Sequence, residues 1–113
     1  MALTSYHKAL KQYQEMPTPK HEADIAMLYS NLLSLYGDMN KTKEAQQTYQ
    51  KVLPLYLKLQ RINPNKYDIP LARVHIMALY YHLDHLISPK EIQKTLNKYP
   101  NNKEAKVLLE IFN

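Results

Sequence analysis

The chain has 113 residues, the size of one domain, with one Gly, no Cys, no Trp and ten Tyr. The lack of cysteine excludes disulfides and thiolate metal sites, and the single glycine disfavours a sheet protein with many tight turns. A formal net charge of +5, with a pI near 9.3, permits an acidic or nucleic-acid partner without requiring one.

Hydrophobic residues make up 45% of the chain, but no apolar run approaches the roughly 18 residues of a membrane helix. The start of the chain, MALTSYHKAL, turns polar too early for a signal peptide. We therefore expect a cytoplasmic protein with no membrane partner. Apolar residues recur at helical spacing without sustained alternation, which predicts one all-α domain over residues 1–113.

Three helices are predicted in the first half of the chain. The first covers about 4–16 and ends at the MPTPK segment. The second extends to about residue 39, with Thr18 as its N-cap and Pro19 in its first turn. The third begins near Thr42 and runs to the break at RINPNKYDIP. Pro54 lies inside this helix, where its missing N–H should kink the helix or divide it.

Three more helices are predicted in the second half. The fourth runs from about 68 to 86. Ser88 and Glu91 form a capping box that begins the fifth, which extends to about 98. The segment KEAKVLLEIF forms the last helix, from 103 to 112.

The helices repeat along the chain. A shift of 43 residues places Tyr6 on Tyr49, and a shift of 44 places Tyr36 on Tyr80. A period of about 40 residues containing two helices is typical of an α-solenoid, because one hairpin cannot bury its apolar face without a stacked neighbour. We therefore expect the second and third helices, and the fourth and fifth, to form antiparallel hairpins that bury Tyr36 and Tyr49 between them.

The segment NLLSLYGDMNKTKEAQQTYQKVL, residues 31–53, resembles the tetratricopeptide repeat. The Leu and Tyr of that family's first helix and the small and aromatic residues of its second are matched by Leu32, Tyr36, Ala45 and Tyr49. The third helix runs long before Pro64, as in the long-repeat, kinesin-light-chain-like variant. The resemblance implies a short right-handed α-solenoid, as a small unit or as a piece of a longer array.

The resemblance further implies a non-catalytic protein–protein interaction module that binds a peptide or protein segment in a concave groove. Transferred position by position, its ligand-facing residues are Asn31, Ser34, Asp38, His75, Tyr81 and His82. Asn31 would supply hydrogen bonds, Tyr81 would stack on the ligand, and titration of His75 and His82 would change the affinity between about pH 5.5 and 7.5.

Other kinds of site have less support in the sequence. His75, His82 and His85 share one stripe of a helix, but no carboxylate joins them, so we expect no metal and no cofactor. No phosphate loop or nucleophile motif indicates an enzyme.

Lys90, Lys94 and Lys98 form a basic edge, with Lys103 and Lys106 nearby. This edge supports an alternative interpretation, a regulatory or nucleic-acid-binding helical repeat. A solvated helix face has the same pattern. Self-association is also expected, because the end helices of such an array lack covering neighbours.

Overall fold

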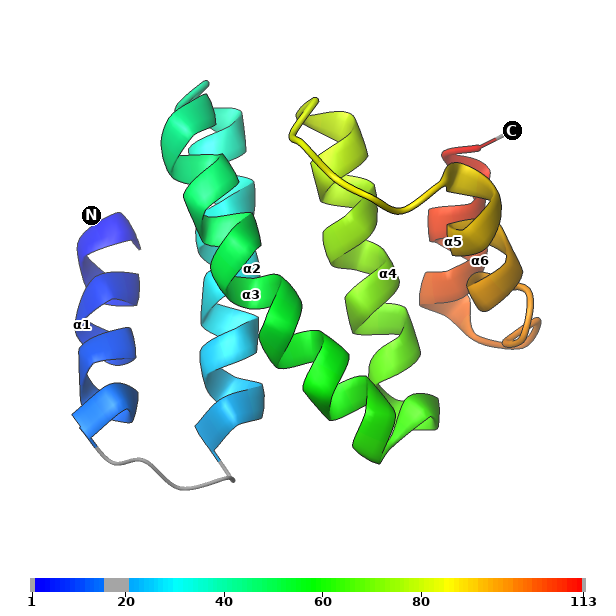
Figure 1. Cartoon of the computed structure of the whole chain (residues 1–113), viewed down its shortest axis with the longest axis horizontal. Helices are drawn as coiled ribbons and strands as arrows, with labels where there is room; N and C mark the ends of the chain where they lie inside the picture. The colour runs from blue at the N-terminus through cyan, green and yellow to red at the C-terminus, as the bar shows by residue number, and fades with distance from the viewer. Residues whose placement is uncertain (1, 16–20, 113) are drawn as a thin grey trace.

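A computed structural model describes residues 2–15 and 21–112, which contain six helices and no strand. In chain order these are α1 (Ala2–Glu15), α2 (Glu22–Asp38), α3 (Thr42–Ile62), α4 (Pro64–Tyr80), α5 (Pro89–Leu96) and α6 (Lys103–Glu110). Each helix packs against the next one along the chain (Figure 1). The predicted all-α class is confirmed, and the arrangement is that of a small helical-repeat solenoid.

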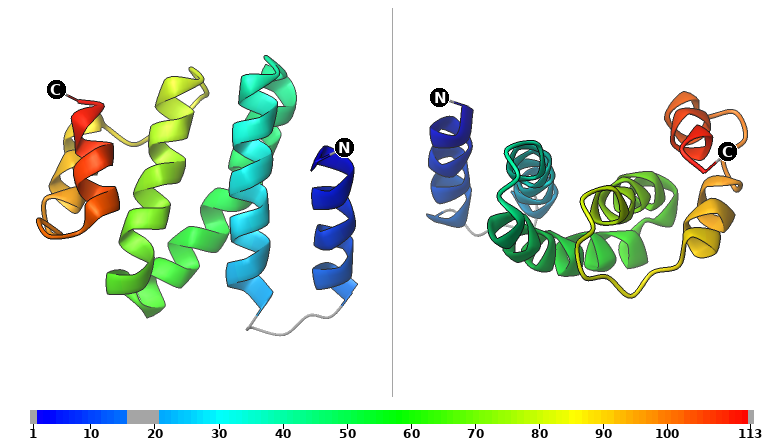
Figure 2. Two further views of the ribbon diagram at one scale, coloured as in Figure 1. Left: turned by 180° about the vertical axis from the view of Figure 1, so that it is seen from behind. Right: turned by 90° about the horizontal axis from the view of Figure 1, so that it is seen from above.

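The helices form two layers. In the left panel of Figure 2, α2, α4 and α6 lie towards the viewer, and α3 and α5 lie behind them. Two clusters of buried side chains fill the space between the helices. The first joins α1, α2, α3 and one side of α4, and the second joins the other side of α4 to α5 and α6. The helix α4 is therefore shared by both clusters.

The helices α2 and α4 end in the same way. Each continues into a residue in the left-handed region, Asn40 with φ 58° and His82 with φ 57°. The N–H of that residue and the next N–H donate back to carbonyls of the last turn, at 3.1 and 2.9 Å for α2 and at 3.2 and 2.8 Å for α4. This is a Schellman motif, and Asn and His tolerate its positive φ better than most residues do.

Several predicted bounds differ from the structure. The cap predicted at Thr18, with Pro19, lies outside the described residues. The helix α4 begins at Pro64 instead of 68, because Asn63 alone interrupts the helical path, and it ends at Tyr80 instead of 86. Pro54 was expected either to kink the third helix or to divide it. Division is wrong, since α3 continues through this proline. Pro54 and Gln50 are both exposed, so water can reach the carbonyl that the proline leaves unpaired.

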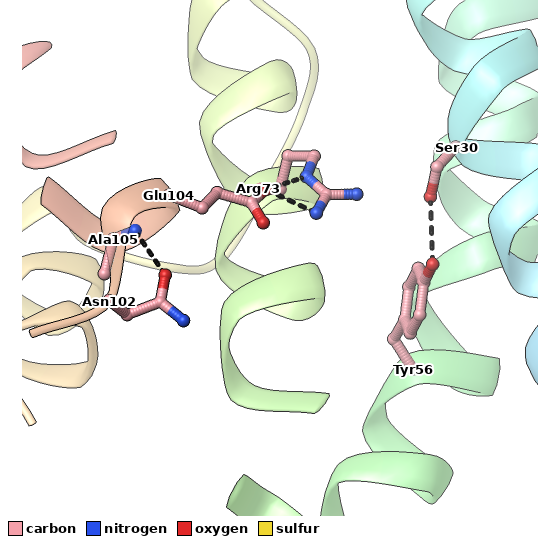
Figure 3. A network of polar contacts seen from close by, with 6 residues as sticks. All are labelled: Ser30, Tyr56, Arg73, Asn102, Glu104 and Ala105. Atoms are coloured by element: carbon pink, nitrogen blue, oxygen red, sulfur yellow. Dashed lines mark hydrogen bonds and ion pairs between the residues drawn. The ribbon is translucent and has the colours of Figure 1, made fainter. Parts of the chain in front are cut away.

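The predicted start of α5 is confirmed, because the Ser88 hydroxyl accepts from the Glu91 N–H at 3.3 Å. The helix α6 begins in the same way, with Asn102 Oδ1 accepting from the Ala105 N–H at 3.0 Å (Figure 3). Next to this cap, the guanidinium of Arg73 on α4 forms an ion pair with Glu104 on α6 (Figure 3).

A second polar contact, centred on Asp68, joins the helices of the C-terminal half of the chain. Asp68 on α4 is buried, and its two carboxylate oxygens accept from Gln60 Nε2 at 2.8 Å and from the Tyr99 hydroxyl at 2.6 Å. The bond to Asp68 is the main reason that the pKa of Tyr99 rises to about 12. A buried carboxylate is tolerated only when its oxygens have donors, so this arrangement fixes α3, α4 and the turn before α6 together.

The predicted burial of Tyr36 and Tyr49 is confirmed, with exposed fractions of 9% and 2%. The predicted equivalence of Tyr36 and Tyr80 is wrong, because the Tyr80 side chain is 72% exposed. The two Schellman ends, at Asn40 and His82, are 42 residues apart instead of 44. Since each residue turns a helix by about 100°, an offset of two residues moves a side chain to another face.

Candidate functional site

An open cavity of about 720 Å³ lies where α2 and α4 end. It is lined by residues from the end of α2, the turn that follows, the start of α3 and the end of α4: Gly37, Asp38, Asn40, Thr42, Ala45, Tyr80, Tyr81, His82 and Leu83. Three of the predicted groove residues, Asp38, Tyr81 and His82, are among them. The structure thus brings together predicted residues from two consecutive repeats.

Tyr81 connects the two sides of this cavity. Its hydroxyl donates to Asp38 Oδ1 at 2.8 Å and also lies 3.2 Å from the Ser34 carbonyl oxygen, which is the contribution of Ser34 to the site. Burial raises the pKa of Tyr81, and the hydrogen bond to Asp38 raises it further. The phenol therefore keeps its proton at neutral pH and holds the end of α4 against α2.

The ring of Tyr81 rests on the backbone of Gly37. A Cβ built at this glycine would overlap three atoms of the ring. Gly37 does not have a positive φ, so close approach, and not backbone conformation, explains why glycine stands here. The only glycine of the chain thus marks the contact between the ends of two repeats.

Tyr80 and His82 extend the site towards solvent. The Tyr80 ring meets the Tyr81 ring edge to face, with centroids 5.1 Å apart and an interplanar angle of 83°. Tyr80 keeps most of its surface free, and His82 is also exposed. The cavity consequently has an aromatic wall, a carboxylate and a mouth that is open to a ligand.

His75 lies in the core and not on this face. Its side chain is 8% exposed, and its Nδ1 is 3.1 Å from the Tyr49 hydroxyl oxygen. Burial, with a smaller contribution from His85, lowers the pKa of His75 to about 4. The expected titration of His75 between pH 5.5 and 7.5 is therefore wrong. The two-residue difference in the register of α4 is the physical reason for its position.

Asn31 is exposed on α2, outside the lining of this cavity. Met27, one turn earlier, is exposed as well. Both residues precede Asp38 on the same helix, so a ligand that leaves the cavity along α2 would reach them.

The lysines of the predicted basic edge, Lys90, Lys94 and Lys98, are all exposed on α5 and just beyond it. Lys103 and Lys106 on α6 are exposed too. Within residues 2–15 and 21–112, no group of three or more His, Cys, Asp or Glu side chains is placed to hold a metal ion. Across the same residues, no helix is long and apolar enough to cross a membrane.

Sequence reasoning missed the contributions of Tyr80 and of the turn at Asn40. The 44-residue superposition places Tyr80 on Tyr36, which is buried. A lone glycine inside a helical pattern was the signal that could have located the site, because such a glycine often marks close packing.

The fold and this site define a small helical-repeat protein with an open cavity between repeats. Comparison with known proteins finds no matching family model and no matching solved structure. The chain is 26% identical over 101 residues to Protein KINESIN LIGHT CHAIN-RELATED 2 of Arabidopsis thaliana. The match covers 88% of this chain but only 15% of that relative. This distant similarity agrees with a helical-repeat protein.

Proposed function

We propose that the chain is a non-catalytic, tetratricopeptide-like interaction module of the cytoplasm. It binds a peptide or protein segment of a partner along α2 and in the cavity at the ends of α2 and α4. The observation that carries this proposal is the cavity itself, which combines Asp38 with Tyr81 and His82 from the next repeat. Concave sites with a few convergent polar groups and aromatic walls are typical of ligand binding.

The contacts of Tyr81 support a preformed site. Tyr81 is fixed by its hydrogen bonds to α2 and by its contact with Gly37. A preformed site loses little conformational entropy when a ligand arrives. The exposed Tyr80 then supplies an aromatic group of the kind that often contributes most to recognition. The exposed Asn31 adds an amide that can donate and accept hydrogen bonds.

Binding also accounts for the lining residues better than catalysis does. Asp38 is hydrogen-bonded to Tyr81, and no bond joins it to His82 or Thr42 among the described residues. A nucleophile paired with a base is the minimum for covalent catalysis, and the cavity lacks that pair.

Site-specific photo-crosslinking tests the location of the partner. Benzoylphenylalanine placed at Asn31 or Tyr80 should trap the same partner from an extract of the source cells. Placed at Lys51 on α3 or Lys94 on α5, both exposed, it should trap none. Crosslinking at Lys94 alone would contradict the proposed site.

The alternative function, nucleic-acid or regulatory binding at the basic edge, is favoured by the exposure of Lys90, Lys94 and Lys98. It predicts tight binding of a random oligonucleotide, with an affinity that falls steeply as salt rises. Our proposal predicts weak binding, unaffected by replacement of Asn31. Tight, salt-sensitive binding that is lost on reversal of the three lysines to Glu would establish the alternative.

A further inference from the structure

We infer that the cavity at the ends of α2 and α4 takes a guanidinium group, so that the partner inserts an arginine side chain. This inference rests on the proposed function and adds the chemistry of the ligand. Three observations support it: the position of Asp38, the arrangement of the two tyrosines and the charge of the lining residues.

Asp38 stands where a helix does not favour a carboxylate. It is the last residue of α2, next to carbonyl groups that carry the negative end of the helix dipole. Neither α2 nor α4 has a basic residue in its last turn to offset that charge. The negative charge of Asp38 is therefore unfavourable at this position, and a bound cation would offset it.

The nearest lysines in the sequence, Lys41 and Lys43, are exposed, and neither forms an ion pair with Asp38. The lining residues include no lysine and no arginine. Thr42, in the first turn of α3, also lines the cavity. The free N–H groups of that turn carry a partial positive charge, which offsets the partial negative charge at the C-terminal end of one of the two helices, α2 or α4. The carboxylate of Asp38 and the carbonyl end of one helix remain, and they favour a cation.

The tyrosines distinguish a guanidinium from an ammonium. Tyr81 donates to Oδ1 of Asp38, and the second oxygen of the same carboxylate is left for a ligand donor. Tyr80 stands edge to face against Tyr81 with most of its ring exposed. A planar guanidinium can donate to a carboxylate while it stacks on an aromatic ring, whereas an ammonium acts as a strongly hydrated point charge.

NMR titration of the ¹⁵N-labelled protein with N-acetyl-arginine methylamide tests the inference. We expect a dissociation constant on the order of millimolar, because one side chain makes few contacts. The shifted amide signals should belong to residues 37–42 and 80–83. The citrulline analogue, which has nearly the same shape without the charge, should bind at least about tenfold more weakly. The lysine analogue should bind severalfold more weakly than arginine. Equal binding of arginine and citrulline would overturn the inference.

Two variants and a matched control locate the contact. Asp38→Asn keeps an oxygen that can accept from Tyr81, so the fold should persist, but arginine binding should fall about tenfold. Tyr80→Ala should weaken it about fivefold. Asp84→Asn removes an exposed carboxylate beside the cavity but outside its lining, and should change binding less than about twofold. Equal losses in Asp38→Asn and Asp84→Asn would reduce the effect to general electrostatics and overturn the assignment.

The same variants separate this inference from the proposed function. A partner that crosslinks at Asn31 and Tyr80 but binds Asp38→Asn as tightly as the wild type would leave the function intact and refute the guanidinium. Specific arginine binding without a crosslinked protein would support the cavity chemistry and count against the interaction module.

Discussion

Replacement of Gly37 by Ala would have two opposing effects on the stability of the protein, one through helix propensity and one through the contact with Tyr81. Alanine is favoured over glycine inside a helix by about 1 kcal/mol. At Gly37, however, the added Cβ would overlap the Tyr81 ring. The ring would have to move, and its hydrogen bonds to Asp38 and Ser34 would be lost or lengthened.

We therefore expect Gly37→Ala to lower the free energy of unfolding by about 1–2 kcal/mol, because overpacking outweighs helix propensity. In a Tyr81→Ala background the ring is absent, and the same substitution should raise stability by roughly 0.5–1 kcal/mol. Urea denaturation of the four proteins measures both changes. The same sign in both backgrounds would contradict the contact.

His75 makes stability depend on pH. Its pKa falls from the ordinary 6.5 to about 4 in the folded chain, chiefly because of burial. Between these values the unfolded chain binds a proton that the folded chain does not. The contribution of His75 to the free energy of unfolding is therefore fully present above about pH 6.5. It is lost as the pH falls towards 4, and the loss is on the order of 3 kcal/mol.

His75→Gln provides the comparison, because Gln can still bond to the Tyr49 hydroxyl but does not titrate. The wild type should lose more unfolding free energy than this variant between pH 6.5 and 4. The carboxylates, and His85 beside His75, are present in both proteins and cancel. Parallel pH profiles would show that His75 is not held neutral by the fold.

At the scale of elements, Tyr49 joins α3 to α4. Its ring is 2% exposed, it meets the His75 ring edge to face, and the two share a hydrogen bond. Tyr49→Ala should cost roughly 3–5 kcal/mol, and Tyr49→Phe about 1–2 kcal/mol for the lost bond. Tyr80→Ala, at an exposed ring, should cost less than about 0.5 kcal/mol. Thermal denaturation measures the stability of these three variants. A similar loss of stability for Tyr80→Ala and Tyr49→Ala would contradict the burial of Tyr49 between α3 and α4.

Local chemistry explains which elements could be predicted. Ser88 before Pro89 began a helix as expected, since a cap depends on only a few neighbouring residues. Pro54 was harder, because whether a helix continues through proline depends on solvent access to the freed carbonyl. The end of α4 was missed, since tyrosines and leucines continue the helical pattern past Tyr80, whereas the chain leaves the helix there through the positive φ of His82.

The candidate site was predicted in part. Asp38, Tyr81 and His82, which the family resemblance assigned to the groove, line one cavity. His75 depended on the rotation of α4, which tertiary packing fixes and a periodic pattern leaves uncertain by one or two residues. The contact of Tyr81 with Gly37 joins two repeats, and a periodic pattern shows which positions are equivalent but not which side chains touch across repeats.

At the scale of the molecule, α6 and the residue that follows it carry exposed apolar side chains, with Val107 60% and Ile111 57% exposed. Burying such surface against a second copy would be favourable by about 25 cal/mol for each Å². We expect the isolated chain to self-associate at high concentration. Light scattering should show a mass above that of the monomer, and Val107→Lys with Ile111→Lys should restore the monomer. A monomeric wild type at every concentration would contradict this prediction.

The central claim is that a partner occupies the face formed by α2 and the end of α4. The most direct test is the affinity of the crosslinked partner for two variants. One is Asn31→Ala with Tyr80→Ala, both at exposed positions, and the other reverses Lys90, Lys94 and Lys98 to Glu. By calorimetry, the first should weaken binding by about 2 kcal/mol with an unchanged melting temperature, and the second by less than about 0.5 kcal/mol. Loss of binding on lysine reversal, with no effect of the first variant, would place the partner on the basic edge and contradict the account.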